Sequence, residues 1–505
     1  MSSTAEHVDV LIVGAGISGV GAAYHLQKRS PGKSYAILES KDVIGGTWDL
    51  FRYPGIRSDS DMHTLGYNFK PWTAAQSIAD GDSILDYVRE TAAENGIDRH
   101  IRFNHKATSA AWSTNDGRWT VEAERSDTDE TVTITCDFLF MASGYFRHDR
   151  GFTPEFPGIE SFGGAVIHPQ HWPEDLDYEG KRVVVVGSGA TAVTLVPALA
   201  EKAAKVTMLQ RSPTYVISLP GEDAIAVGLR KVLPEKAAYA VTRWKNVLLQ
   251  SAFYRLCKRF PGRMKALLLK GMKKGLPEGF DVDKHFNPKY NPWDQRVCLI
   301  PDGDLFDALA AGRADVVTDT IKVFDEAGIE LDSGDRIDAD IVITATGLNL
   351  LFLGDVDVSV DGTRPDIPNS FTYKGMMLND IPNFAFALGY TNASWTLKVD
   401  LVCEYACRLI NYMDANGYRE CVPRVTDPTV TEEQLIDFNS GYVLRSLHEL
   451  PKQGSKIPWK LRQNYVRDVP ELRRGELADG TMQFSRGATA STPPEAEVAS
   501  SGIPG

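Results

Sequence analysis

The order of apolar and small residues near the start of the chain predicts a strand, a helix and a second strand. Val8–Val13 is an almost continuous apolar run, which is typical of a strand buried inside a parallel sheet. The sequence Gly-Ala-Gly-Ile-Ser-Gly at residues 14–19 follows it and opens a helix of small residues that reaches Leu26. A second apolar run, Tyr35–Leu38, then ends at Glu39. Strand, glycine loop, helix, strand and acid in this order indicate a dinucleotide-binding β-α-β unit.

The residue types of this unit match what a bound dinucleotide requires. Gly14 permits a tight turn, Gly16 lets a pyrophosphate approach the backbone, and Gly19 lets the helix pack closely on the strand. The unpaired N–H groups at the start of the helix attract the phosphates. The carboxylate of Glu39 can accept hydrogen bonds from ribose hydroxyls.

The same pattern recurs later in the chain with one chemical difference. A strand at Arg182–Val186 leads into Gly-Ser-Gly-Ala-Thr-Ala at residues 187–192, a helix to about residue 200 and a strand at Lys205–Leu209. This second strand ends without an acid, and Arg211 follows it. A guanidinium can pair with a 2′-phosphate, whereas a carboxylate would repel it. The first site therefore suits FAD, and the second suits NADPH rather than NADH.

Two further strands end in small residues and predict how the two units are connected. Phe138–Met141 precedes Ala-Ser-Gly at residues 142–144, and Ile341–Thr344 precedes Ala-Thr-Gly at residues 345–347. Such turns are expected where the chain passes between an FAD domain and an NADP domain inserted in it. The predicted fold class is α/β with two Rossmann-like dinucleotide-binding domains and a helical insertion. The expected segments are 1–144 and 348–486 for the FAD domain, 150–215 and 290–347 for the NADP domain, 216–289 for the helical insertion and 487–505 for a disordered tail.

Residues 216–289 fit neither dinucleotide-binding unit. They are rich in Lys, Arg and Leu at helical spacing and hold few acids, although the whole chain carries a net charge of −13. Two interpretations stay open. The segment is either a patch for a membrane surface or a partner, or an insertion with a solvated basic face, which is the more ordinary arrangement.

Composition narrows the class of protein further. A chain of 505 residues with 43% apolar and 24% charged residues is typical of a globular protein of two or three domains. The negative net charge argues against a nucleic-acid partner. The six cysteines show no metal or redox spacing, and Cys403 and Cys407, one turn apart in a predicted helix at Leu401–Met413, are expected to be buried thiols. Neither a signal peptide nor an apolar run of roughly 18–20 residues is seen, so a cytoplasmic location is expected.

Two longer patterns tie this fold to a chemistry. Residues 162–173 fit F-x-G-x(3)-H-x(3)-W-P, and residues 45–59 fit [AG]-G-x-W-x(4)-[FY]-P-[GM]-x(3)-D. On these patterns the chain resembles the type I Baeyer–Villiger monooxygenases over roughly residues 8–470. The stretches Phe51–Asp61 and Pro292–Arg296 are similar to the ethionamide-activating branch of that family. Gln295 stands where many relatives have lysine.

The resemblance implies a flavoprotein oxidoreductase that uses FAD, NADPH and O2. Such enzymes convert ketones to esters or lactones through a flavin C4a-peroxide and oxidise sulfides as a side activity. The resemblance places Asp59 beside the flavin, where it orients Arg296. A guanidinium stays cationic at any working pH and can stabilise the charge of the peroxide and of the oxyanion that follows.

The resemblance and the glycine loops together give a set of candidate site residues. The catalytic pair is Arg296 and Asp59, and no metal is expected. Predicted FAD contacts are Gly14, Gly16, Ser18, Gly19, Glu39, Gly46, Thr47, Trp48, Asp59 and Ala107, the last expected just after a strand at Ile101–Lys106. Predicted NADP contacts are Arg57, Ser58, Gly187, Ser188, Gly189, Ala190, Thr191, Ala192, Arg211 and Ser212. Phe162, Gly164, His168, Trp172 and Pro173 are expected to couple domain motion rather than to catalyse.

Three other functions compete with this one. A flavin-containing N- or S-monooxygenase would lack both the Trp172-Pro173 ending and the Asp59/Arg296 pair. A disulfide reductase would need a C-x(4)-C sequence after the first glycine loop, which is absent. An NADPH-sensing or membrane-associated scaffold would have no use for Asp59 and Arg296. The expected partners are a small ketone or sulfide and O2, with a peripheral membrane contact left open and the oligomeric state undefined.

Overall fold

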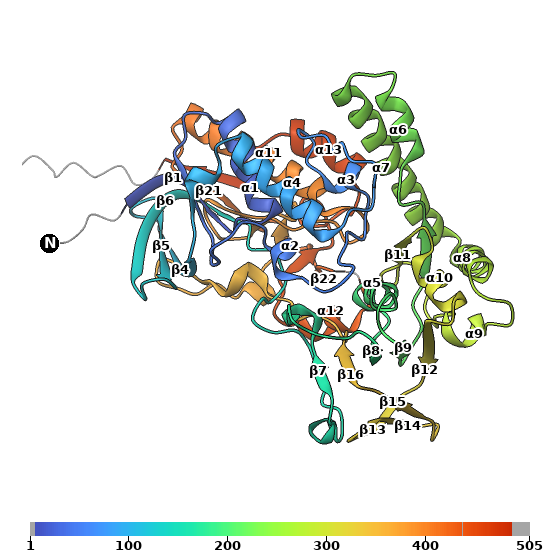
Figure 1. The fold of residues 1–505 in the computed structure, drawn as a ribbon. Coiled ribbons are helices and arrows are strands. Elements are labelled where there is room, and N and C mark those ends of the chain that lie inside the picture. The colour runs from blue at the N-terminus through green and yellow to red at the C-terminus, as the bar shows by residue number, and fades with distance from the viewer. Residues whose placement is uncertain (1–5, 437, 487–505) are drawn as a thin grey trace, which may run out of the picture.

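Two sheet-based domains and a helical arm make up the fold of the computed structural model (Figure 1). The structure describes residues 6–436 and 438–486 of the 505-residue chain. The predicted tail, residues 487–505, lies outside the described residues.

The first domain is built on an eight-stranded sheet. Its spatial order is β17 (Asp357–Val360), β4 (His105–Ser113), β5 (Arg118–Arg125), β6 (Thr131–Met141), β1 (Glu6–Val13), β2 (Tyr35–Leu38) and β3 (Ile101–Arg102), with β20 (Phe384–Phe386) also pairing with β6. Successive residues of β1 enter two different cores. Val10 and Ile12 face the helices α1 (Ile17–Arg29), α4 (Gly81–Glu94) and α11 (Trp395–Asn416), whereas Leu11 and Val13 join a cluster around Trp112 and Trp119.

The second domain contains a five-stranded parallel sheet. Its order is β12 (Ala314–Thr318), β9 (Lys205–Gln210), β8 (Arg182–Val186), β16 (Ile341–Thr344) and β7 (Ala165–Ile167). The helices α5 (Ala190–Leu199) and α10 (Asp304–Ala310) pack on one face. An antiparallel sheet of β13 (Ile321–Asp325), β14 (Gly328–Leu331) and β15 (Arg336–Asp338) covers the other face. Parallel strands with both faces covered explain the continuous apolar runs of β8 and β16.

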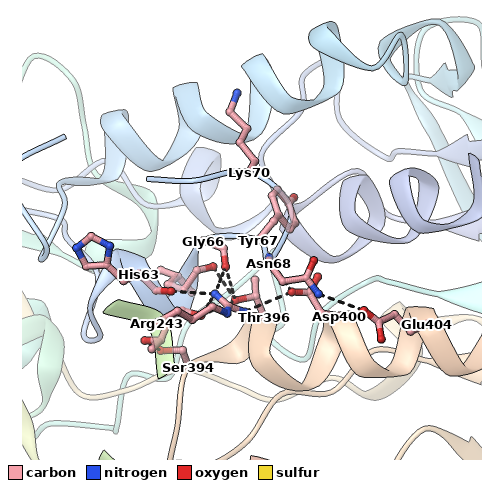
Figure 2. A network of polar contacts seen from close by, with 12 residues as sticks. His63, Gly66, Tyr67, Asn68, Lys70, Arg243, Ser394, Thr396, Asp400 and Glu404 are labelled. Atoms are coloured by element: carbon pink, nitrogen blue, oxygen red, sulfur yellow. Dashed lines mark hydrogen bonds and ion pairs between the residues drawn. The ribbon is translucent and has the colours of Figure 1, made fainter. Parts of the chain in front are cut away.

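The helical insertion projects from the second domain and reaches the first (Figure 1). It consists of α6 (Ala224–Arg230), α7 (Glu235–Arg259), α8 (Pro261–Gly275) and α9 (Val282–His285). Its first residues differ from the helical prediction, because Val216–Leu219 forms strand β10 in parallel with β11 (Cys298–Pro301). Arg243 of α7 enters a polar network in the first domain (Figure 2).

Smaller elements complete the first domain and the region between the domains. They are α2 (Thr47–Leu50), α3 (Met62–Leu65), α12 (Gly441–Ser446), α13 (Tyr465–Arg474) and three strand pairs: β18 (Thr372–Tyr373) with β19 (Met377–Leu378), β21 (Glu420–Pro423) with β24 (Met482–Ser485), and β22 (Glu432–Gln434) with β23 (Lys452–Gly454). All six cysteines are buried free thiols, as expected for Cys403 and Cys407. Among the described residues, no helix has both the length and the apolar character needed to cross a bilayer.

One predicted strand is wrong. The expected strand at Ile101–Lys106 is two strands, β3 and β4, separated by a turn in which Asn104 has φ of 59°. A left-handed residue cannot continue a strand, and asparagine tolerates that conformation well. Ala107 therefore lies inside β4 rather than after a strand, at a point where the pairing with β5 shifts register.

Candidate active site

A cleft of about 1740 Å³ lies between the two domains and is bounded on one side by the helical insertion. Both glycine loops open into it. So do the segment that contains Asp59, the residues that precede β11, and parts of α6 and α7. A cavity this large can hold two dinucleotides together with a small substrate.

The first glycine loop is shaped by backbone contacts. Gly14 has φ of 106°, and a Cβ there would lie 2.6 Å from the carbonyl oxygen of Ala142. A Cβ on Gly19 would lie 1.8 Å from the carbonyl oxygen of Gly14, so the loop and helix α1 can approach only with glycine at this position. A Cβ on Gly16 would lie 3.6 Å from the Cα of Gly46, and both glycines line the cleft.

The end of strand β2 places Glu39 against this loop. Glu39 is buried, and its carboxylate accepts hydrogen bonds from the backbone N–H groups of Ala15 at 2.7 Å and Lys41 at 3.0 Å. These bonds fix the carboxylate at the wall of the cleft. Its remaining lone pairs are positioned to accept from a ribose.

The second glycine loop repeats this geometry. Gly187 has φ of 139°, and a Cβ there would lie 2.3 Å from the carbonyl oxygen of Ala345, just as Gly14 meets Ala142. A Cβ on Gly189 would meet nothing within 4 Å, because it faces the open cleft. Helix α5 begins after Gly189 without a side-chain cap, so its first N–H groups remain available to phosphates.

The residues after β9 supply a cation beside that loop. Arg211 is exposed and lines the cleft, and within the part of the chain that the structure describes no acidic partner holds it. The Ser188 hydroxyl donates to the Ser212 carbonyl oxygen at 2.9 Å, which ties the glycine loop to the segment that carries Arg211. This arrangement suits a 2′-phosphate better than a free ribose hydroxyl.

Arg296 and Asp59 form an ion pair in the cleft. They come from different domains: Asp59 follows the buried Ser58 in the loop before α3, and Arg296 precedes β11. The side chains keep 35% and 41% of their surface exposed, so the pair faces the space that ligands would fill. The family resemblance led us to expect these two residues to meet, and the structure brings them together.

An aromatic wall stands near the first glycine loop. Trp395, at the start of α11, donates from Nε1 to the Ser18 hydroxyl at 2.8 Å and stacks on Tyr145 with ring centroids 5.0 Å apart. Both rings line the cleft. Trp459, by contrast, is a buried core residue packed near Tyr373.

His168, the histidine of the pattern at residues 162–173, is not among the residues that line the cleft. His168 Nδ1 accepts from the Gln170 N–H at 3.2 Å, and its Nε2 lies 3.2 Å from the carbonyl oxygen of Gly347, the last residue of the turn after β16. Burial lowers the pKa of His168 below its ordinary value. A neutral imidazole with one acceptor and one donor nitrogen satisfies both bonds.

The other residues singled out in the pattern at residues 162–173 make packing and backbone contacts within the second domain. Phe162 contacts Phe324, Trp172 packs against the core of the second domain, and Pro173 accepts from the Leu176 N–H. A Cβ on Gly164 would lie 2.2 Å from the Asp340 carbonyl oxygen.

Most of the predicted cofactor contacts line the cleft, with two informative exceptions. Gly19 and Ala192 occupy equivalent loop positions and pack behind it. Arg57 lines the cleft but is paired with Asp304, and the buried Ser58 hydroxyl donates to the Ser60 carbonyl oxygen at 2.7 Å. The predicted residues found in the lining are Gly14, Gly16, Ser18, Glu39, Gly46, Thr47, Trp48, Asp59, Ala107, Arg57, Ser58, Gly187, Ser188, Gly189, Ala190, Thr191, Arg211, Ser212 and Arg296.

Sequence reasoning missed a group of lining residues that no short pattern contains. Asp61 accepts hydrogen bonds from Asn246 at 2.8 Å and Gln250 at 2.7 Å, which joins the Asp59 segment to α7. Arg445 of α12 lies over the ring of Phe152. The polar residues at helical spacing on α7 were the available signal, but only the fold shows which face they present.

The residues present fit the two cofactors. The backbone cradles at Gly16 with Gly46 and at Gly189 would be filled by added Cβ atoms, so they leave room for pyrophosphate groups. Glu39 suits an unphosphorylated ribose, and Arg211 suits a phosphorylated one. Fold and cleft together define a flavoprotein class with two dinucleotide sites in one chain.

Comparison with known proteins narrows this class. The model of the flavin-binding monooxygenase-like family matches residues 75–364, and that of an NAD(P)-binding Rossmann-like domain matches residues 12–76. The FAD-containing monooxygenase EthA of Mycobacterium tuberculosis (strain ATCC 25618 / H37Rv) is 59% identical over 482 residues, which cover 95% of this chain and 98% of that protein. The chain therefore belongs to the flavin-binding monooxygenases, and within them to the FAD-containing monooxygenases similar to EthA.

Solved structures support the fold. Oxidized steroid monooxygenase bound to NADP superposes with a TM-score of 0.75 at 24% identity, covering 95% of this chain and 100% of that one. Cyclohexanone monooxygenase from Rhodococcus sp. Phi1 bound to NADP+ gives a TM-score of 0.73 at 18% identity with the same coverage. The predicted family and fold class are confirmed.

Proposed function

We propose that this flavin monooxygenase uses FAD, NADPH and O2 to convert ketones to esters or lactones, and that it oxidises sulfides as a side reaction. The observation that carries the proposal is the Arg296–Asp59 pair, placed in the cleft between the two glycine loops. Both cofactors agree with the similar proteins, since EthA is an FAD-containing monooxygenase and the steroid monooxygenase structure is bound to NADP. When bound, reduced flavin supplies the activation of O2, and NADPH supplies the electrons.

The chain's own residues have three roles in this proposal. Glu39 and the Gly14–Gly19 loop hold FAD, while Arg211 and the Gly187–Ala192 loop hold NADPH. Arg296 supplies a fixed positive charge where negative charge develops on the transferred oxygen and on the attacked carbonyl.

Asp59 and the aromatic wall prepare the site for that charge. Asp59 aims the guanidinium of Arg296, so the cation is oriented before the reaction begins. Trp395 and Tyr145 form an apolar wall that, together with bound cofactors, excludes water and so strengthens the charge interaction. The proposed role of His168 is different: it links the fingerprint segment to Gly347, where the chain passes between the domains.

A peripheral contact between the helical insertion and a lipid surface belongs to the same proposal. Its support is the local excess of lysine and arginine in a chain whose net charge is −13.

The direct test is product analysis. Purified protein containing FAD is supplied with NADPH and air together with linear, cyclic and aryl ketones, and products are identified by gas chromatography. Esters or lactones that need both NADPH and O2 support the proposal. Oxidation of sulfides or amines without ester from any ketone would contradict it.

A further inference from the structure

One face of helix α7 is exposed along its length and changes from apolar to basic. The exposed residues Val241, Trp244, Leu248, Arg255 and Arg259 recur at spacings of three, four or seven, which places them on a single stripe. The solvent-facing side of a surface helix normally carries polar residues, so the exposed Val, Trp and Leu side chains are unusual. We call these five residues the α7 stripe.

The elements on either side of α7 continue this character. The connection between α6 and α7 exposes Lys231, Val232 and Leu233, and Val232 keeps 76% of its surface exposed. At the other end, Phe260 is exposed between Arg259 and Arg263, whose guanidinium carbons each lie 5.8 Å from its ring centroid.

Helix α8 adds a second exposed stripe. Its members are Arg263, Leu267, Lys270 and Lys274, again at helical spacing. The insertion therefore exposes large apolar side chains and a group of cations on the same two helices.

The charge of the insertion is opposite to that of the molecule. Between residues 224 and 275 the only acid is Glu235, against Arg230, Lys231, Lys236, Arg243, Lys245, Arg255, Lys258, Arg259, Arg263, Lys265, Lys270, Lys273 and Lys274. Some of these cations are engaged: Arg243 pairs with Asp400, Lys245 with Asp223 and Lys258 with Asp294. Those of the α7 and α8 stripes have no carboxylate within salt-bridge distance among the described residues.

The mouth of the cleft opens beside the α7 stripe. Ile225 of α6 and Leu249 of α7 line the cleft, and they are 57% and 61% exposed. Leu249 follows Leu248 of the stripe directly. Phe253, one helical turn further along α7, also lines the cleft and is half-buried. An apolar path therefore leads from the exposed insertion into the cavity that contains Arg296.

We propose that the insertion docks on an anionic lipid surface and that lipophilic substrates enter the cleft from the lipid through the mouth at Ile225 and Leu249. The docking step stands on the insertion alone, whereas the substrate step rests on the proposed ketone oxidation. The occupant is a bilayer because exposed Trp, Leu and Phe side chains, next to cations without a carboxylate partner in the described part of the chain, match an anionic headgroup layer above hydrocarbon. A nucleic acid would gain little from the exposed Val, Leu and Trp side chains.

Vesicle binding tests the docking step without any catalysis. Purified holoenzyme is sedimented with phosphatidylcholine vesicles and with 1:1 phosphatidylcholine/phosphatidylglycerol vesicles over a range of salt. Binding should require the anionic lipid and should weaken as salt rises. The double variant R255E/R259E should bind at least about 20-fold more weakly, since each basic side chain near such a surface contributes about fivefold.

Two further variants test whether vesicle binding depends on this surface and on its apolar side chains. K181E/K202E changes the net charge equally at exposed positions of the second domain and should bind like the unmodified protein. W244S/L248S should lower binding at all salt concentrations, because it removes apolar contacts rather than charge. Unchanged binding by R255E/R259E, or no binding of the unmodified protein at low salt, would overturn the proposal. So would a change in sedimentation coefficient without a change in vesicle binding, which would make this surface an interface between copies of the chain.

Kinetics test the entry path. With a water-soluble ketone and no vesicles, L249D should raise the KM for ketone several-fold with little change in kcat, because it places a charge at an apolar mouth. L267D is the matched control: Leu267 is 59% exposed on α8 but does not line the cleft, and the KM of this variant for the ketone should not change.

A ketone held in a membrane tests entry from the lipid. With a long-chain ketone held in anionic vesicles, R255E/R259E should lose most of the rate while keeping the rate on the soluble ketone. Equal rates on the vesicle-held ketone would overturn the entry path, whereas no ester from any ketone would instead refute the proposed function and leave the vesicle result standing.

Discussion

Arg243 of the helical insertion and Asp400 of α11 form a buried ion pair, with Nη2 and Oδ2 3.3 Å apart (Figure 2). The other terminal nitrogen of Arg243 donates to the carbonyl oxygens of His63, Thr64 and Gly66 at 2.9, 3.2 and 2.7 Å. One guanidinium thus holds the end of α3 and joins the insertion to the first domain. Asp59 lies in the loop just before α3, so the Arg243 contacts are close in sequence to one member of the proposed catalytic pair.

Removing this anchor should destabilise the protein strongly. Arg243→Ala removes the cation that compensates the buried charge of Asp400. The carboxylate keeps its contacts with His25 and the Asn68 N–H. The change also removes one donor to three backbone carbonyls in a dry environment, and we expect a loss of about 3–5 kcal/mol in the free energy of unfolding. Arg243→Lys keeps the charge but not the planar fork and should recover only part of the loss. Arg255→Ala, on the exposed stripe of the same helix, should change stability by less than about 0.5 kcal/mol. Urea unfolding measures all three, and equal stability of the Arg243→Ala and Arg255→Ala variants would refute the anchor.

The proposed role of Arg296 predicts that its loss spares the oxidation of NADPH but impairs the transfer of oxygen to the ketone. Arg296→Ala should still bind FAD and oxidise NADPH, but its rate of ester formation should fall about 10²–10³-fold, as is typical when one stabilising contact to a developing oxyanion is lost. Asp59→Asn should cause a smaller loss, because the cation remains but is no longer aimed. The measurement compares ester formed with NADPH consumed. A normal ratio in Arg296→Ala would show that another group stabilises the transferred oxygen.

The position of Arg211 predicts cofactor selectivity. Arg211→Ala should raise the KM for NADPH much more than the KM for NADH, because only NADPH carries the 2′-phosphate. Arg313→Ala, at another exposed arginine of the second domain, is the control and should leave both values unchanged. Equal changes for the two cofactors in Arg211→Ala would mean that the phosphate is read elsewhere.

Gly189 offers a test of the cofactor site that does not depend on activity. An added Cβ would meet no protein atom within 4 Å, so Gly189→Ala should fold normally. It should nevertheless weaken NADP+ binding, because the methyl group occupies the space through which a pyrophosphate approaches. Gly187→Ala, with φ of 139° and a Cβ 2.3 Å from a carbonyl oxygen, should instead lower stability. Calorimetric titration with NADP+ and thermal unfolding separate the two effects, and unaltered NADP+ affinity in Gly189→Ala would remove this loop from the site.

His168 predicts a dependence of stability on pH. Burial lowers its pKa below the ordinary value of 6.5, although the hydrogen bond to Gly347 acts in the opposite direction. Below pH 6.5 the unfolded chain takes up a proton that the folded chain resists, so this contribution is complete above pH 6.5 and is lost as pH falls through the folded pKa. Relative to His168→Gln, the unmodified protein should lose stability between pH 7.5 and pH 5 by at most about 1.4 kcal/mol per pH unit. Urea unfolding of both proteins across this range checks the sign, and a relative gain at pH 5 would contradict it.

The parts of this molecule that could be predicted from sequence are those with short-range physical causes. The strands at Tyr35–Leu38 and Ile341–Thr344 have the predicted bounds, because a short apolar run that ends at an acid or at a small-residue turn leaves few alternatives. The turn at Asn104 was missed, since a single residue with positive φ interrupts an otherwise extended stretch. The pairing of Asp59 with Arg296 was predicted only through a family resemblance.

Other features depend on contacts that no local pattern encodes. Arg243 and Asp400 are more than 150 positions apart, and nothing in either neighbourhood predicts their pairing. The lysines and arginines of the insertion gave the right local charge, but only the fold shows that Trp244 and Leu248 share their exposed face. Side-chain direction on a long helix is decided by what packs against it.

Isotope labelling tests the central claim most directly, that the cleft around Arg296 transfers one atom of O2 to a ketone. Purified FAD-containing protein is mixed with NADPH, a ketone and ¹⁸O2, and the product is analysed by mass spectrometry. We expect an ester or lactone with a single ¹⁸O atom, formed in step with NADPH consumption by the unmodified protein and lost in Arg296→Ala. NADPH consumption that yields only hydrogen peroxide, or an ester whose new oxygen comes from water, would contradict it.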